Sequence, residues 1–257
     1  MNFLDSHAHL MGEEFAADLD AVLERAEKAQ VTRIMIITLS QAEAERALAF
    51  ADAHPQAGFS VSTGIFVDEA GTYTEDDWNR FEHLAKDPRI SCVGEIGLDY
   101  HWEKDAAVHQ RQKELFIRQI ELAKALKKPI AVHSRDAMQD TYDILKAHRA
   151  RGLLHCFSGS KEMALEFTKL GYYIALGGAV TFKNSRHSRE VATAIDGRYL
   201  LSETDSPYMA PEPVRGTRNE PANIPYIVAA LAALRSVSTA EMAALIQDNW
   251  ARFLERQ

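Results

Sequence analysis

The stretch Phe3-Leu4-Asp5-Ser6-His7-Ala8-His9 sets the interpretation of the whole chain, because an apolar start runs directly into two histidines two residues apart. In a β-strand, side chains at positions i and i+2 point to the same face. His7 and His9 would then converge at the end of a strand, where their imidazoles suit a metal ion. Two such histidines are more often ordinary surface or core residues, so a metal site requires further ligands at equivalent places.

The composition is that of a soluble globular protein, with 257 residues of which 46% are hydrophobic and 26% are charged. No apolar run approaches the length of a membrane span. The N-terminus lacks the basic and apolar regions of a secretion signal. Cys92 and Cys156 lie far apart in apolar, strand-like contexts, so we expect buried thiols rather than a disulfide, and hence a cytoplasmic protein.

The formal net charge of −8 limits the ways in which the protein could meet nucleic acid. A protein that coats nucleic acid needs a basic face, which this balance disfavours. An enzyme that binds phosphate groups through divalent metal ions is still compatible with this net charge. Part of the acidic excess would then belong to the metal site itself.

Short apolar runs alternate with amphipathic segments along the whole chain, which predicts eight strand–helix units. The predicted strands are 3–9, 33–38, 59–65, 90–95, 129–133, 153–155, 172–176 and 199–204. The predicted helices are 18–29, 42–53, 75–85, 108–126, 137–147, 161–170, 188–195, 224–234 and 239–252. We therefore expect an α/β protein in which residues 1–257 form a single (β/α)8 barrel domain. A doubly wound open sheet is the alternative.

Metal-ligating side chains stand at the ends of the predicted strands, where the active site of such a barrel lies. They are His7, His9, Glu95, His133, His155 and Asp205. A single catalytic zinc takes only three protein ligands, so this set suits two divalent ions.

The expected division gives His7, His9 and Asp205 to one ion and His133 and His155 to the other, with Glu95 as the bridge. Two ions roughly 3.5–4 Å apart activate water and stabilise the attacking and leaving oxygens in phosphoryl transfer. Asp205 is also the natural general base. The mixed nitrogen and oxygen ligands leave zinc, manganese and magnesium open.

Three charged residues stand next to these ligands in the sequence. Glu203 lies one step deeper than Asp205 on the same strand face, and we expect it to orient a ligand or to serve as an internal charge partner. Asp5 stands in the same relation to His7. Arg135 could donate two hydrogen bonds to a phosphate group. A salt bridge to Asp136 within the loop is the alternative.

Weaker signals for substrate contact come from two loops. Arg218 and Asn219 follow the eighth strand in a loop rich in proline, glycine and polar residues. Trp102 lies in the loop after Glu95, where an exposed ring could stack on a base. The other two tryptophans, Trp78 and Trp250, fit helix packing.

Taken together, these motifs resemble the TatD-related metal-dependent hydrolases, a branch of the amidohydrolase-like barrels. The matching segments are Asp5-Ser6-His7-Ala8-His9-Leu10, Gly94-Glu95-Ile96-Gly97-Leu98-Asp99-Tyr100, His133-Ser134-Arg135-Asp136-Ala137, His155-Cys156-Phe157-Ser158-Gly159 and Glu203-Thr204-Asp205-Ser206-Pro207-Tyr208. The resemblance spans nearly the whole chain. It implies a (β/α)8 barrel with a two-metal site on the six ligands above. It also implies a divalent-metal-dependent deoxyribonuclease, often a 3′-to-5′ exonuclease, which is a hydrolase acting on ester bonds.

One departure from the family follows the third strand. The family usually carries Gly-x-His-Pro-His there, whereas this chain has Gly64-Ile65-Phe66-Val67-Asp68. None of the six proposed ligands is lost, so hydrolysis should survive. A polar contact near the substrate is lost, and Phe66 adds a stackable apolar surface.

Three hypotheses for function follow. The first is a phosphodiesterase acting on DNA, single-stranded or at 3′ ends, through a metal-bridged hydroxide with Asp205 as base. The second is a hydrolase of small phosphoesters, amides or lactones with the same metals; Glu95 stands where related amidohydrolases often use a carboxylated lysine, which disfavours that branch. The third is a non-catalytic binding module, against which the intact ligand set argues. Metal identity, exonuclease or endonuclease preference, DNA or RNA preference and the oligomeric state stay open, with a monomer as the working assumption.

Overall fold

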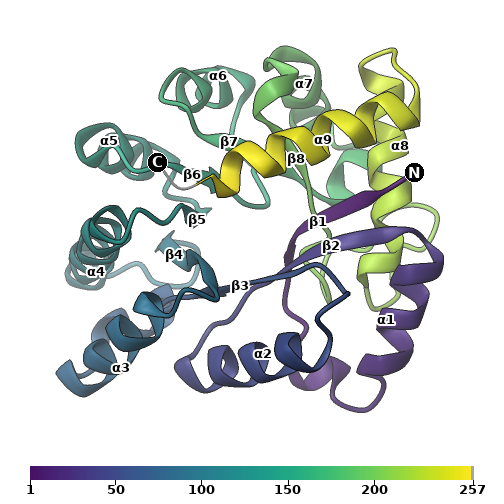
Figure 1. Ribbon diagram of the computed structural model, residues 1–257. Helices are drawn as coiled ribbons and strands as arrows, with labels where there is room; N and C mark the ends of the chain where they lie inside the picture. Colours follow the sequence, from purple (N-terminus) through teal and green to yellow (C-terminus); the bar gives the residue numbers. More distant parts are fainter. Residues whose placement is uncertain (256–257) are drawn as a thin grey trace.

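A computed structural model describes residues 1–255 and contains one sheet of eight parallel strands in the order β1 to β8 (Figure 1). The strands are β1 Phe3–Ala8, β2 Val31–Ile36, β3 Phe59–Thr63, β4 Ile90–Asp99, β5 Ile130–Arg135, β6 Gly152–Leu154, β7 Tyr173–Leu176 and β8 Leu200–Ser202. Beyond β8, the Asp205 amide donates to the His7 carbonyl and the His9 amide to the Ser206 carbonyl, both at 2.9 Å. These bonds join the last strand to the first, and the predicted (β/α)8 barrel is confirmed.

Helices follow the strands and cover the outside of the barrel (Figure 1). The α-helices are α1 Leu19–Lys28, α2 Gln41–Ala53, α3 Glu75–Lys86, α4 Ala106–Ala125, α5 Met138–His148, α6 Lys161–Lys169, α7 Arg186–Ala194, α8 Ile224–Leu234 and α9 Thr239–Leu254. Short 3-10 helices are η1 Glu13–Phe15, η2 Val67–Gly71, η3 Gly178–Thr181, η4 Gly197–Tyr199 and η5 Pro221–Asn223. Because helices cover one face of the strands and the barrel interior the other, most strand residues are buried and apolar.

The fourth strand is longer than the sequence indicates. It was expected to end at Glu95, but β4 continues to Asp99 because its residues 97–99 pair with residues 133–135 of β5. Gly97 makes this pairing possible: its φ is +150°, and a Cβ built there would lie 1.9 Å from the His133 carbonyl oxygen. The pairing register shifts between Val93 and Ile96, around Glu95. The segment 97–99 is therefore strand, where the sequence predicted the start of a loop.

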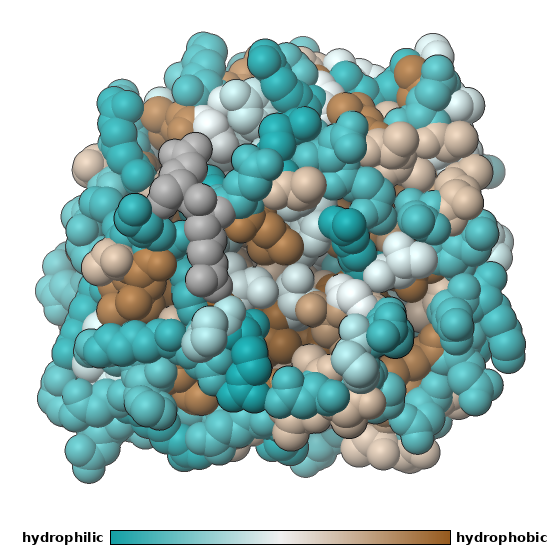
Figure 2. Space-filling model, viewed as in Figure 1, coloured by the Kyte–Doolittle hydropathy of each residue, from teal (hydrophilic) through white to brown (hydrophobic). Residues whose placement is uncertain are grey.

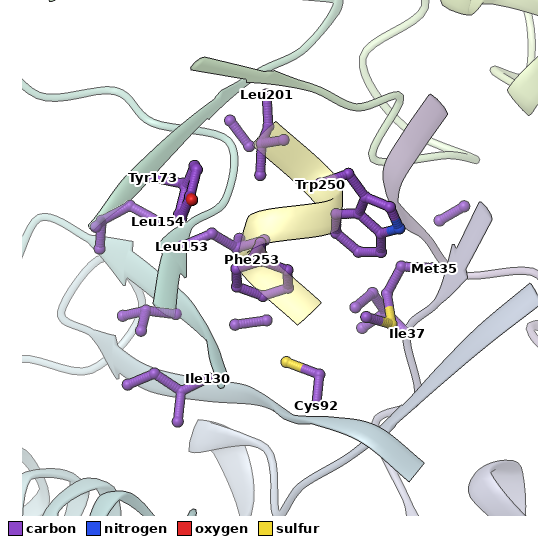
Figure 3. Packing of buried hydrophobic residues seen from close by; sticks show 14 of the residues in the cluster. Met35, Ile37, Cys92, Ile130, Leu153, Leu154, Tyr173, Leu201, Trp250 and Phe253 are labelled. Atoms are coloured by element: carbon purple, nitrogen blue, oxygen red, sulfur yellow. The ribbon is translucent and has the colours of Figure 1, made fainter. Parts of the chain in front are cut away.

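Helix α9 lies across the N-terminal end of the barrel and closes it with apolar side chains (Figure 1). Its Trp250 and Phe253 point into a cluster with Cys92, Tyr173 and other strand residues (Figure 3). The rings of Trp250 and Phe253 stack with centroids 5.1 Å apart. Cys92 is a buried free thiol, as expected, and the free thiol of Cys156 is only partly buried.

The surface seen from this end is mostly polar, with apolar patches between charged side chains (Figure 2). Within residues 1–255, no single helix is both long and apolar enough to span a membrane. One pair, Pro221–Leu234 and Thr239–Leu254, meets the criteria of length and composition together but is bent by 105°.

Candidate metal centre

Glu95 lies between two pairs of histidines at the C-terminal end of the barrel. Its Oε2 atom is 3.2 Å from His7 Nε2 and 3.6 Å from His9 Nε2. Its Oε1 atom is 2.8 Å from both His133 Nδ1 and His155 Nε2. Each carboxylate oxygen therefore faces its own pair of ring nitrogens, which is the arrangement of a carboxylate shared by two groups of ligands.

Asp205 completes the first of these two groups. Its Oδ1 atom lies 3.5 Å from His9 Nε2 and 3.7 Å from His7 Nε2. The backbone of Asp205 has φ of 55°, in the left-handed region, and its amide donates to the His7 carbonyl at 2.9 Å. The bond to β1 fixes this uncommon conformation and aims the carboxylate at the two histidines.

The donor set fits divalent metal. Two triplets, His7 with His9 and Glu95, and Glu95 with His133 and His155, each keep their ligand atoms within 4.8 Å of one another. Imidazole nitrogens and carboxylate oxygens in such compact groups are ligands for zinc, manganese and related ions. The buried ring nitrogens would otherwise face one another, since those of His7 and His9 are only 3.2 Å apart.

The site also holds its carboxylates ionised and one histidine neutral. Burial would raise the pKa of Glu95, but His155, His133 and His7 together bring it well below its usual range. Asp205 behaves likewise, since contacts with His9, His155 and His7 outweigh its burial and lower its pKa. Burial and the charge of His155 lower the pKa of His7 to about 4. Ionised carboxylates and a neutral imidazole are the forms that bind metal.

Asp99 is a site residue for which the sequence gave no role. Its Oδ2 atom is 3.2 Å from His133 Nε2, so this ring presents Nδ1 to Glu95, whereas His7 and His155 present Nε2. Asp99 Oδ1 accepts from the His101 amide at 2.7 Å. Burial lowers the pKa of His133, but Asp99 and Glu95 raise it to about 10. A carboxylate on the far nitrogen of a metal-ligating histidine fixes its orientation.

The protein's family is established by a family model described as TatD related DNase, which matches residues 4–255. The chain belongs to this family. It is 38% identical over 248 residues to the uncharacterized metal-dependent hydrolase YabD of Bacillus subtilis, covering 95% of this chain and 96% of that protein. It is 31% identical over 254 residues to a protein of Pantoea vagans named 3′-5′ ssDNA/RNA exonuclease TatD, covering 95% and 96%.

Among solved structures, that of YjjV, a TatD homologue from Escherichia coli K12, matches with a TM-score of 0.90 and 29% identity. The match covers 98% of this chain and 97% of the other. The resemblance noted from the motifs is thus confirmed, and the protein is a metal-dependent hydrolase of the TatD family.

Two glutamines of α4, which the sequence did not single out, hold the loops around the site. Gln112 accepts from the Asp99 amide at 3.1 Å and donates to the Asp99 carbonyl at 3.0 Å. Gln119 makes the same pair of bonds with Ile65, at 2.7 and 3.0 Å. Their spacing of seven residues puts both on one helix face. They tie the segment after β3, which includes Phe66, and the end of β4, which carries Asp99, to the buried face of one helix.

Asp5 and Glu203 lie behind the ligands, where the sequence placed them. Asp5 accepts from the amides of Thr204 at 2.8 Å and His7 at 3.2 Å. Burial outweighs these bonds and raises the pKa of Asp5 to about 7. Glu203 accepts from the Cys156 amide through Oε1, and its buried Oε2 has no hydrogen-bond partner among the described residues. A carboxylate oxygen of Glu203 also lies within 4.8 Å of ring nitrogens of His7 and His155. Its role in orienting them stays a prediction.

Arg135, Trp102 and Phe66 stand around the second group of ligands. The expected alternative partner of Arg135, Asp136, instead lies 2.9 Å from His101. Arg135 has its guanidinium carbon 5.2 Å from the Trp102 ring centroid and forms no ion pair within residues 1–255. The Phe66 ring lies edge-on to His133, with centroids 5.6 Å apart. Contact of these three with substrate stays a prediction.

Arg218 and Asn219 are engaged with the protein itself. Arg218 forms a two-point ion pair with Asp18 at 2.8 and 2.7 Å and donates to the Glu14 carbonyl. Asn219 is fully buried and donates to the carbonyls of Thr204 and Tyr208 at 2.9 and 2.7 Å. The predicted substrate contact by Asn219 is wrong, because its side chain is buried and its amide group donates both of these hydrogen bonds to the loop after β8. Substrate contact by Arg218, which is exposed, stays a prediction.

Proposed function

We propose that this chain is a divalent-metal-dependent phosphodiesterase that removes nucleotides from the 3′ end of single-stranded DNA. The observation that carries this proposal is the position of Glu95, whose two oxygens each face a separate pair of imidazoles. A carboxylate so placed suits two metal ions, and two-metal sites are typical of nucleases and phosphatases. The name of the Pantoea vagans relative supports nucleic acid as the substrate.

Two ions would be held by different parts of the cluster. The first would take His7, His9, Asp205 and Glu95 Oε2; the second would take Glu95 Oε1, His133 and His155. Divalent ions bound there lower the pKa of water and stabilise the negative charge that develops on phosphoryl oxygens.

The chain's own side chains supply the proton transfer and the orientation. Asp205 is ionised and stands beside the first pair of histidines, so it can accept the proton of the attacking water. Asp99 keeps the His133 ring in the orientation that turns Nδ1 to Glu95. Arg135, which forms no ion pair among the described residues, can donate hydrogen bonds to a phosphate group of the substrate.

Phe66 favours a second candidate function, hydrolysis of small phosphoester, amide or lactone substrates. It stands where the family usually has a histidine, and its ring packs against His133. This replaces a polar side chain at the mouth of the site by an apolar one. The same metal cluster would serve that chemistry.

Release of nucleotides from a 3′-labelled single-stranded oligonucleotide tests the proposal, with magnesium, manganese or zinc added to protein freed of metal. We expect metal-dependent release that falls by about 100-fold or more in Asp205→Asn, a loss of the size seen when one catalytic group is removed. Asp248→Asn, an exposed site on α9 at the other end of the barrel, is the matched control and should keep full activity. Hydrolysis of a small ester without any nucleotide release would replace this proposal by the second candidate.

A further inference from the structure

Two strongly exposed aromatic residues stand in the loops that border the metal cluster. Trp102, in the loop after β4, is 72% exposed, and Tyr208, in the loop after β8, is 57% exposed. Single exposed apolar side chains are common on protein surfaces, so a binding role for these two rings has to rest on what surrounds them. Both loops also carry or adjoin proposed ligands, since β4 contains Glu95 and Asp205 precedes Tyr208 by three residues.

Tyr208 lies on the side of the first ligand group. Its ring centroid is 6.4 Å from that of His9, in an edge-on arrangement. Its backbone is held at both ends, because its amide donates to the Asp205 carbonyl at 2.9 Å and its carbonyl accepts from Asn219 at 2.7 Å. The ring is therefore an exposed surface on a fixed backbone, next to a metal ligand.

Trp102 lies on the side of the second ligand group. Its ring meets the His101 ring edge-on, with centroids 4.6 Å apart, and His101 donates its amide to Asp99, which holds His133. Arg135 lies 5.2 Å over the same indole and is paired in register with Asp99 across β4 and β5. An aromatic ring and a cation that forms no ion pair in residues 1–255 thus stand together, and the chain of contacts through His101 and Asp99 links them to His133. This combination suits a base and its phosphate.

We propose that Tyr208 and Trp102 are stacking surfaces for the two nucleotides on either side of the cleaved phosphodiester. Glu95 lies between them, since one oxygen faces the histidines near Tyr208 and the other faces His133 near Trp102. The substrate class is then a single-stranded nucleic acid with an unpaired base on each side of the scissile bond. This inference rests on the proposed function and adds to it which bases are contacted and by which residues.

The test pairs enzyme variants with oligonucleotides that lack one base. Three single-stranded substrates share the same phosphodiester: one complete, one abasic at the 3′-terminal nucleotide and one abasic at the next. Trp102→Ala and Tyr208→Ala should each lower kcat/KM on the complete substrate by about 10-fold or more, the usual effect of losing one stacked base. For each variant, removing the base that the lost ring would stack on should hardly change kcat/KM, whereas removing the other base should still lower it. The abasic position without effect should be a different one for each of the two variants.

Conservative and remote variants separate stacking from a structural role. Trp102→Phe and Tyr208→Phe keep a ring and should recover most of the loss. Tyr226→Ala removes another exposed aromatic, on α8, that has no ring contact with the ligands, and it should leave kcat/KM unchanged.

Fluorescence gives a readout that does not depend on hydrolysis. Trp78 and Trp250 are only 7% and 1% exposed, so Trp102 is the tryptophan that a bound base can reach. A single-stranded oligonucleotide added in the presence of a chelator should quench the wild-type emission, and Trp102→Phe should abolish the change.

The outcomes distinguish this inference from the proposed function. A wild type that releases nucleotides, with alanine variants equal to it or equally impaired on all three substrates, overturns the stacking surfaces alone. Quenching without nucleotide release from any substrate overturns the proposed function and supports Trp102 as a binding surface. Neither quenching nor release overturns both.

Discussion

The two ends of the barrel use the same uncommon backbone conformation for different purposes. At the N-terminal end, non-glycine residues with positive φ end helices, as Arg149 does after α5 with φ of 50°. At the C-terminal end they follow strands, as Cys156 does after β6 and Asp205 after β8. The conformation thereby stops helices at one end, whereas at the other end it aims the Asp205 carboxylate at His7 and His9.

The interiors of the two ends differ as well. The C-terminal end buries charged and polar groups, among them Asp5, His7, Glu95 and Glu203. The N-terminal end is filled by apolar rings from α9, and its buried amide Asn249 is satisfied by the carbonyls of Gly197 and Leu200 at 2.8 and 2.6 Å. Stability and chemistry are thus assigned to opposite ends, as in barrel enzymes generally. Substitutions at each end should therefore affect different properties.

The largest effect is expected at Glu95. Glu95→Gln removes the charge that both ligand groups share, so metal content and activity should fall together, with activity reduced by about 10³-fold or more, equal to about 4 kcal/mol on the barrier. Elemental analysis after dialysis and nucleotide release measure the two. A variant that keeps its metal and its activity would break the contrast between the ends.

The converse change is Phe253→Ala at the N-terminal end. This ring is fully buried between Trp250 and Tyr173, with centroid distances of 5.1 and 5.8 Å. Its loss should lower the free energy of unfolding by about 3 kcal/mol, the cost of a cavity in a packed core. Urea unfolding measures this, with Phe253→Leu as the milder control. The kcat/KM of the folded fraction should stay at the wild-type value; a large drop would show that the ends are coupled.

Asp99 gives an intermediate effect confined to the metal centre. Asp99→Leu removes the acceptor for His133 Nε2, and metal affinity should fall by about 10–100-fold, as for other residues that orient ligands. Calorimetric titration with zinc measures the affinity, and ¹⁵N chemical shifts of His133 report which ring nitrogen carries the proton. Asp99→Asn keeps an acceptor oxygen and should lie close to wild type in both. If Asp99→Leu bound metal normally, the orienting role would be rejected.

The smallest effect is a pH dependence near the N-terminal end. Hydrogen bonds from Arg89 lower the pKa of Asp87 to about 2, against a usual 3.8. A lowered pKa stabilises the fold above pH 3.8, and this contribution is lost as the pH falls toward 2. Since Arg89 is exposed and Asp87 only partly buried, solvent screening keeps this contribution small. The free energies of unfolding of wild type and Asp87→Asn, measured between pH 5 and 2, should differ at pH 5 and converge at pH 2. A constant difference over this range would contradict the lowered pKa of Asp87.

The features that could be predicted from the sequence are those that depend on the local pattern of residues. The alternation of apolar runs and amphipathic segments was enough for the barrel, and the six proposed ligands could be recognised because each stands at or near a strand end. The predicted strand 153–155 lies one residue later than β6, which is Gly152–Leu154. The predicted strand 199–204 is longer than β8, which is Leu200–Ser202, since residues 203–204 follow the paired segment.

What depends on distant partners could not be predicted. Asp99 was missed because β4 extends only through pairing with β5, which no local signal reveals. Gln112 and Gln119 bond to backbone groups 13 and 54 residues away. The ion pair of Arg218 is equally hidden in the sequence, since its partner, Asp18, lies 200 residues earlier in the chain. The residues that hold the site are therefore less visible in the sequence than those that form it.

The seam between β8 and β1 has a consequence for the order of biosynthesis. The first ligand group joins His7 and His9 to Asp205 across that seam, so its members are separated by nearly the whole chain. A polypeptide still on the ribosome carries the two histidines long before residue 205 has been made, and it has no complete cluster in the meantime. Hydrolytic capacity thus arises only after most of the barrel has been translated.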